Sequence, residues 1–197
     1  MKSIIQSRYV LWLILAIPAL PMLAGLWSNG FNDRLLHPTG EFSARFMIIA
    51  MMATPLRMLF PQSRITRWLI KCRREFGLAA AAYAALHTLI YVVDMGTFQA
   101  MLDEFAVFGI WTGWLAMLVF VPLAITSNDA SVRALGTAWK SLQRLVYPAA
   151  VATLAHWIFI DNDLGPALVH FVPLAALETY RIWRNATRSP RKQESTA

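Results

Sequence analysis

The stretch from Arg73 to Met95 constrains this chain more than any other part of the sequence. After two arginines and Glu75 it continues for about twenty mostly apolar residues as far as Asp94. An α-helix rises about 1.5 Å per residue, so this length crosses the roughly 30 Å hydrocarbon core of a bilayer. His87 lies well inside the stretch, and an ionisable side chain at that depth is costly unless something binds it. The stretch therefore predicts a membrane-spanning helix that carries a functional histidine.

The composition of the whole chain agrees with a membrane protein. Of its 197 residues 57% are apolar and only 15% are charged, and the mean hydropathy is +0.48, which is too apolar for a soluble domain of this size. The single cysteine, Cys72, excludes an internal disulfide, a cysteine-ligated zinc or iron–sulfur site and the attachment motif of a c-type haem. No Rossmann glycine motif or P-loop is present, so the chain carries no soluble nucleotide-binding domain of its own.

Six apolar segments predict an all-α integral membrane protein, a bundle of six transmembrane helices. The first segment could instead be a cleaved signal peptide. Its length, its two prolines and the lack of a clean small-x-small cleavage site favour an uncleaved span. We expect a Gly/Asn/Pro loop from Trp27 to Glu41, a single domain over residues 1–183 and a basic cytoplasmic tail over 184–197. The predicted spans are approximately 9–27, 42–59, 75–94, 105–125, 144–160 and 166–183.

The distribution of charge predicts the orientation. Sixteen of the 18 lysines and arginines lie near the N-terminus, in the segments 57–74 and 127–144, or after residue 180, which leaves only Arg34 and Arg45 for the opposite side. The positive-inside rule then predicts that both termini are cytoplasmic in the inner (plasma) membrane of a bacterium. The same distribution explains the net charge of +7 without any nucleic-acid partner, and it suits contact with lipid phosphates.

Two histidines are predicted to lie at matched depth. His87 is 13 residues past Arg74 and His156 is 12 past Arg144, so both are roughly 18–20 Å from the inner surface, on helices that run the same way. Two such imidazoles could bind the iron of one b-type haem from its two faces. Small residues around both histidines leave volume for a macrocycle, although small residues in spans also serve close helix packing. A lone histidine in a span can also simply hydrogen-bond another helix.

Other polar side chains allow alternatives. His170 enters from the outer side and lies roughly 16 Å from Arg181, so it is a rival ligand that spacing cannot rank. Arg45 could pair with a haem propionate, since a guanidinium matches a carboxylate, or extend to the membrane surface. His37 is expected to be an exposed loop residue. Arg73 and Arg74 belong to a basic cluster that serves topology and lipid contact, with docking of a cytosolic electron donor as the less favoured addition.

Four stretches together resemble the ferric-reductase-like transmembrane family. Within that family the best likeness is to the haem-binding membrane subunits of periplasmic methionine-sulfoxide reductase systems, the MsrQ/YedZ group. The set is fairly specific, although each piece alone is weak. The four stretches are Thr39–Phe46 with Thr54–Arg57, Arg73–Leu78 through Leu86-His87, Leu123–Ser127, and Leu142–Tyr147 through His156.

The resemblance implies a six-helix haem b protein. Such a protein passes electrons from a cytoplasmic flavin reductase, or from quinol, to a periplasmic molybdenum-cofactor reductase that repairs oxidised methionine. Flavin mononucleotide is an implied additional cofactor. His87 matches the family's haem ligand on the third span, and His156 matches its outer ligand on the fifth. Gln143 stands where the family pattern usually has histidine, and because glutamine is a poor haem ligand this departure argues against a second, inner haem.

Three functions fit the sequence. The first is a transmembrane electron carrier, rather than a catalytic subunit, with one haem b bound by His87 and His156. The second is a stand-alone membrane reductase or oxidase that acts on ferric chelates, quinone or superoxide. The third is a small transporter or assembly protein whose histidines relay protons or bind substrate. Transporters of that kind carry inverted repeats and acid–base chains near the midplane, and neither is evident here.

Overall fold

A computed structural model describes residues 8–29 and 35–188, and in this part of the chain the regular structure is entirely α-helical. Several helices begin or end at residues with a clear backbone reason. Gly96 follows α5 with a φ of 67°, and Asn162 follows α10 with a φ of 52°, the left-handed region that ends helices. The helices are α1 (Arg8–Ala16), α2 (Ala19–Asn29), α3 (Leu36–Leu59), α4 (Arg64–Lys71), α5 (Arg73–Met95), α6 (Phe98–Glu104), α7 (Phe108–Ile125), α8 (Asp129–Leu135), α9 (Thr137–Gln143), α10 (Val146–Asp161) and α11 (Leu164–Arg188).

Each of the six predicted spans contains helix, and at three of them the helices begin, break or end at other residues than the predicted spans do. The first segment is divided into α1 and α2, which meet at 43° beside Pro18, whose missing N–H interrupts a helix. Helix α3 begins at Leu36 rather than Phe42, because Pro38 lies in its first turn, where no N–H is needed. The predicted loop is therefore shorter, and residues 30–34 of it lie outside the described residues.

Helix α11 continues to Arg188, so the predicted tail begins later than residue 184. Arg184 donates hydrogen bonds to the Tyr180 hydroxyl one turn earlier and to the Met58 carbonyl on α3, which anchors this extra turn. The rest of the predicted tail, 189–197, lies outside the described residues. The connections between predicted spans also contain helices that the sequence analysis did not predict, namely α4, α6, α8 and α9.

Three described helices, α3, α5 and α7, are long and apolar enough to cross a membrane, and the bent pair α1–α2 makes a fourth if it forms one span. Helix α10 has 16 residues, or about 24 Å, which is shorter than a typical hydrocarbon core. The described chain is thus an all-helical protein with three or four membrane-capable helices.

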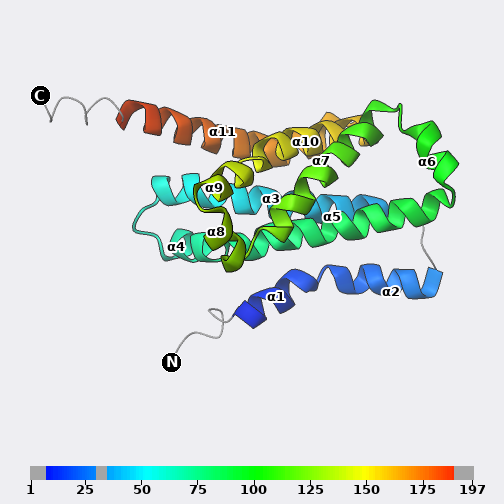
Figure 1. The fold of residues 1–197 in the computed structure, drawn as a ribbon, viewed down its shortest axis with the longest axis horizontal. Helices are drawn as coiled ribbons and strands as arrows, with labels where there is room; N and C mark the ends of the chain where they lie inside the picture. The colour runs from blue at the N-terminus through cyan, green and yellow to red at the C-terminus, as the bar shows by residue number, and fades with distance from the viewer. Residues whose placement is uncertain (1–7, 30–34, 189–197) are drawn as a thin grey trace, which may run out of the picture.

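Two helix pairs form the core. Helix α3 packs along α5, α7 packs along α10, and α11 covers α3. Alanines with no exposed surface lie in these contacts (Ala53, Ala80, Ala149, Ala167), as expected where backbones approach closely. Figure 1 shows the long helices side by side, with α4, α8 and α9 at one end of the bundle and α6 at the other. The two pairs adjoin less closely between α5 and α7, and the candidate site lies there.

Candidate functional site

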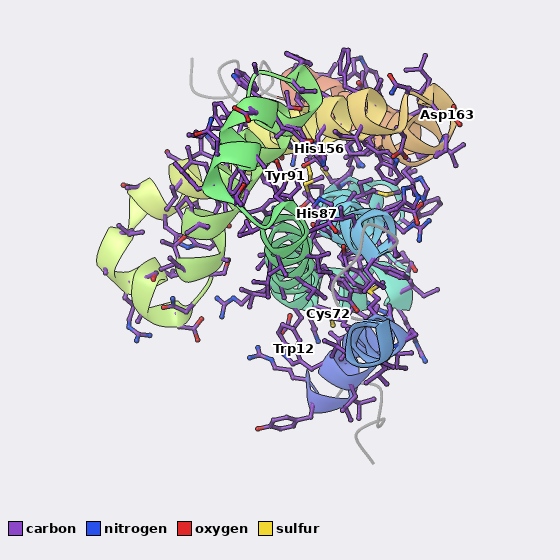
Figure 2. All side chains as sticks on the ribbon, turned by 90° about the vertical axis from the view of Figure 1, so that its right-hand side faces the viewer. Trp12, Cys72, His87, Tyr91, His156 and Asp163 are labelled. Carbon is purple, nitrogen blue, oxygen red and sulfur yellow. The ribbon has the colours of Figure 1, made fainter. Side chains whose placement is uncertain are left out.

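The structure brings His87 and His156 together from opposite helix pairs. His87 lies on α5 and His156 on α10, and their ring centroids are 5.9 Å apart with the ring planes at 84°. Figure 2 looks along the bundle and shows the two labelled histidines, with Tyr91, where α5 faces the α7–α10 pair. Two metal–imidazole bonds of about 2 Å, one on each side of a metal, separate two ring centres by roughly 6 Å. The observed spacing therefore suits two axial ligands of one iron.

Each ring is held by a backbone carbonyl from a neighbouring helix. Nδ1 of His87 donates to the Leu36 carbonyl at 2.9 Å, and Nδ1 of His156 donates to the Gly109 carbonyl at 2.7 Å. A carbonyl can only accept, so the proton resides on Nδ1 and leaves Nε2 as the metal-binding nitrogen. Thr39 adds a hydroxyl oxygen 3.3 Å from Nδ1 of His87. Metal-ligating histidines commonly have this type of support on the other nitrogen.

A pocket adjoins both imidazoles. It contains about 650 Å³ of space, part of it open to the surroundings, and residues of α3, α5, α7 and α10 line it. Its walls are mostly apolar or small, for example Ala84, Met117 and Phe120. Mostly apolar walls with a few polar groups are typical of sites for small molecules and cofactors. Two imidazoles at this spacing, beside apolar walls, fit a haem, which brings its own four nitrogens to the iron.

The structure does not bring His170 and Arg45 to the pocket. Nδ1 of His170 donates to the Pro166 carbonyl at 2.7 Å, and its Nε2 accepts from Nε of Arg45 at 3.2 Å. The ring also stacks on Trp157 at 5.4 Å. Arg45 forms an ion pair with Glu41 at 2.8 Å. Both nitrogens of His170 are thus engaged, and the arginine has partners of its own.

The other outer histidine, His37, lies in the first turn of α3 and not in a loop. Its side chain is 54% exposed and lies 3.8 Å from Glu41 and 3.5 Å from Asp161. Asp161 in turn accepts a hydrogen bond from the indole of Trp157. These side chains link α3 to α10, and none of them lines the pocket.

A second, larger cavity lies toward the end of the bundle that holds α4, α8 and α9. It contains about 2240 Å³, including open space, and Arg73, Arg74 and Gln143 are in its wall. Arg74 is 2.7 Å from Asp129, and its hydrogen bond lowers the pKa of that exposed carboxyl. Phe120 lines both cavities, so it lies at the boundary between them. We call this second cavity the inner cavity. Five further cations line it: Arg8, Lys71, Lys140, Arg144 and Arg181.

Gln143 has a structural role in this chain. Its Nε2 donates to the Leu123 carbonyl at 3.2 Å and to the Thr126 hydroxyl at 3.1 Å. These bonds tie the end of α9 to the last turn of α7. A side chain that is already engaged in this way has little freedom to act as a ligand.

Sequence reasoning missed the backbone groups of the site. The carbonyls of Leu36 and Gly109 carry no residue-type signal, because every residue has a carbonyl. Tyr91, whose hydroxyl donates to Glu104 at 3.4 Å, also lines the pocket and was not singled out. Its position one turn after His87 is the signal that could have indicated it.

Comparison with known proteins gives a consistent result. Residues 39–154 match the family described as the ferric reductase like transmembrane component. His87 lies inside this match, and His156 lies just beyond it. No solved structure matches the chain.

Several curated relatives share one description, protein-methionine-sulfoxide reductase heme-binding subunit MsrQ. The relative from Azospira oryzae is 30% identical over 92% of this chain and 80% of that protein. The relative from Brucella anthropi is 32% identical over 95% of this chain and 88% of its own length. The relative from Caulobacter vibrioides is 32% identical over 80% of this chain and 77% of its own.

Proposed function

The chain belongs to the ferric reductase like transmembrane family and, within it, to the haem-binding MsrQ subunits of protein-methionine-sulfoxide reductases, and from this premise we propose that it carries electrons across the bacterial inner membrane on one haem b held by His87 and His156. The observation that carries the proposal is the pair of imidazoles 5.9 Å apart, each with Nδ1 bound to a carbonyl. That geometry leaves both Nε2 atoms for one iron.

The residues of the pocket have three proposed roles: holding the haem, supporting its ligands and excluding water. When bound, the haem supplies one-electron redox chemistry at its iron. His87 and His156 would hold it, and the carbonyls of Leu36 and Gly109 would make their imidazoles more basic. The apolar walls, including Met117 and Phe120, keep water from the site. Ligation by two histidines and burial would set the reduction potential of the haem.

The inner cavity is our candidate for the donor side. Its cationic lining, with Arg73 and Arg74, suits the phosphate of flavin mononucleotide, and its apolar wall would also accept a quinol. A cytoplasmic flavin reductase or quinol would supply the electrons. Gln143, which is engaged with α7, supports a single haem in this chain. The acceptor would be a periplasmic methionine-sulfoxide reductase catalytic subunit that carries a molybdenum cofactor.

We further propose six spans with both termini in the cytoplasm, in one domain over residues 1–183. The arrangement is supported by α4, α8 and α9, which lie at one end of the bundle (Figure 1) and include Arg64, Arg67, Lys71, Arg133 and Lys140. Helix α6, at the other end, has no lysine or arginine and contains Asp103 and Glu104. That asymmetry follows the positive-inside rule.

An optical spectrum of the detergent-purified protein, oxidised and reduced and with iron quantified, tests the proposal. We expect the spectrum of a low-spin bis-histidine haem at about one iron per chain, since the two imidazoles occupy both axial positions. His87→Ala and His156→Ala should each abolish haem retention, whereas the exposed control His37→Ala should retain it. A colourless wild-type protein, or an unchanged spectrum in both ligand variants, would contradict the proposal.

A further inference from the structure

The two candidate ligands are held in the same way on different helices. The carbonyl that accepts from His87 belongs to Leu36, and the residue one helical turn later on α3 is Gly40. The carbonyl that accepts from His156 belongs to Gly109, and one turn later on α7 comes Gly113. Residues four apart lie on the same helix face. Each imidazole therefore faces a carbonyl and a glycine on a single face of the neighbouring helix, and we name each such pair a cradle.

The glycines are in direct contact with the rings. A Cβ added at Gly113 would lie 2.7 Å from Nδ1 and 2.8 Å from Cε1 of His156. A Cβ added at Gly40 would lie 3.2 Å from the same two atoms of His87. Contacts below 3.0 Å require atoms to move, so any side chain at position 113 displaces the His156 ring, and one at position 40 presses on the His87 ring less strongly.

Among the glycines of the described residues, only Gly40 and Gly113 would bring an added Cβ against a histidine ring; at Gly109 an added Cβ would instead lie 2.9 Å from Ile160. A Cβ added at Gly77, on the same helix as His87, would meet nothing within 4 Å. Each glycine also comes from the helix that packs most closely on its histidine's own helix, α3 on α5 and α7 on α10. The two ring planes, held by separate helices, are nearly perpendicular at 84°.

We infer that Gly40 and Gly113 are positioning residues for the haem. By lacking a side chain they let each imidazole reach the carbonyl one turn earlier, and this fixes the rotation of the two ring planes independently. The inference rests on the proposed function, because it assumes that His87 and His156 are the axial ligands. It adds that the orientation of the ligands, and not only their identity, is built into α3 and α7.

The variants Gly113→Ala, Gly40→Ala and Gly77→Ala in the full-length purified protein test this inference. The readouts are the haem-to-protein ratio, haem affinity by titration, and the electron paramagnetic resonance spectrum of the ferric haem, which depends on the angle between the two imidazole planes. We expect haem affinity to fall about 10–100-fold in Gly113→Ala, as for the loss of other groups that orient metal ligands. Gly40→Ala should show a smaller fall and a shifted resonance signal, and Gly77→Ala should match the wild type.

The outcomes distinguish a failure of the proposed function from a failure of the cradles alone. Wild-type protein without haem would refute the proposed function. Haem bound equally, with the same resonance signal, in wild type, Gly113→Ala and Gly40→Ala would refute the cradles alone. If Gly113→Ala loses helical content by circular dichroism, the milder Gly40→Ala decides, because its contact of 3.2 Å allows the ring to shift within a folded protein. An unchanged signal in that folded variant would overturn the inference.

Discussion

A histidine in a membrane helix has two ring nitrogens, and the partner of one decides what the other can bind. His87 and His156 each donate Nδ1–H to a carbonyl, so Nε2 is left for a metal. His170 has the same kind of bond from Nδ1, to Pro166, but its Nε2 already accepts from Arg45. At the scale of the residue, this difference separates three histidines that depth alone could not rank.

We therefore expect His170→Ala to retain haem with an unchanged spectrum. The substitution removes an acceptor from Arg45, which keeps its ion pair with Glu41 at 2.8 Å, and a ring that stacks on Trp157. A loss of about 1–2 kcal/mol in unfolding free energy is the expected cost. The haem-to-protein ratio measures the first expectation, with His156→Ala as the variant that should lose haem. Complete haem loss from folded His170→Ala would show that His170 is a ligand.

Cys72, between α4 and α5, offers a test of local burial. Burial raises the pKa of its thiol, and the nearby Glu75 carboxylate raises it further. A higher pKa means less thiolate at neutral pH, so alkylation should be slower in the native protein than in unfolded protein. The native rate should continue to increase above pH 8.5, roughly where a free thiol reaches half-ionisation. Since this is the chain's one cysteine, mass spectrometry of iodoacetamide-treated protein measures the rate without background.

At the scale of the element, small residues let the paired helices pack closely, and a few hydrogen bonds between the helices accompany this packing. Ala53 on α3 has no exposed surface. Ser43 on the same helix is 5% exposed and donates to the Ala80 carbonyl on α5 at 2.9 Å. In lipid the apolar surroundings give little hydrophobic drive between helices, so close packing has to supply the association.

Overpacking should thus cost more than a lost hydrogen bond. We expect Ala53→Leu to lower the unfolding free energy by about 1–3 kcal/mol, and Ser43→Ala by about 0.6 kcal/mol. Thermal unfolding followed by circular dichroism in one detergent ranks the two variants. The reverse order would mean that the buried hydroxyl contributes more than the packing of α3.

At the scale of the whole molecule, the two ends of the bundle differ in charge. Figure 1 shows α4, α8 and α9 together at one end and α6 at the other. The first group is basic, and α6 is acidic. The polarity of the molecule thus matches a conduit with a cytoplasmic donor cavity at the basic end and an outward haem site nearer the acidic end.

Labelling with a membrane-impermeant maleimide tests this orientation. In intact spheroplasts we expect no labelling of Cys72, whereas inside-out vesicles should label it, with protein unfolded in detergent as the reference for full reaction. A cysteine introduced at the exposed Thr97 in a Cys72→Ser background should show the opposite pattern, because Thr97 precedes α6. Labelling of both positions from the same side would contradict the proposed topology.

Hydropathy and charge are properties of each segment alone, so they were enough to predict a helical membrane protein. Distance along a helix follows from residue count, so depth indicated His87, His156 and His170 as candidate ligands, and the family resemblance favoured the first two. The sequence could not locate the break at Pro18, the start of α3 or the short helices in the connections, because these depend on which backbone groups find partners.

Which imidazoles meet, and which groups hold them, depends on how the helices pack. A ring's rotation depends on atoms of another helix: the Leu36 carbonyl and Gly40 for His87, the Gly109 carbonyl for His156. Likewise, Arg45 reaches His170 only because α3 and α11 pack together. Such contacts join residues far apart in the chain, and the physical reason they escape sequence reasoning is that no local pattern encodes which faces of two helices will touch.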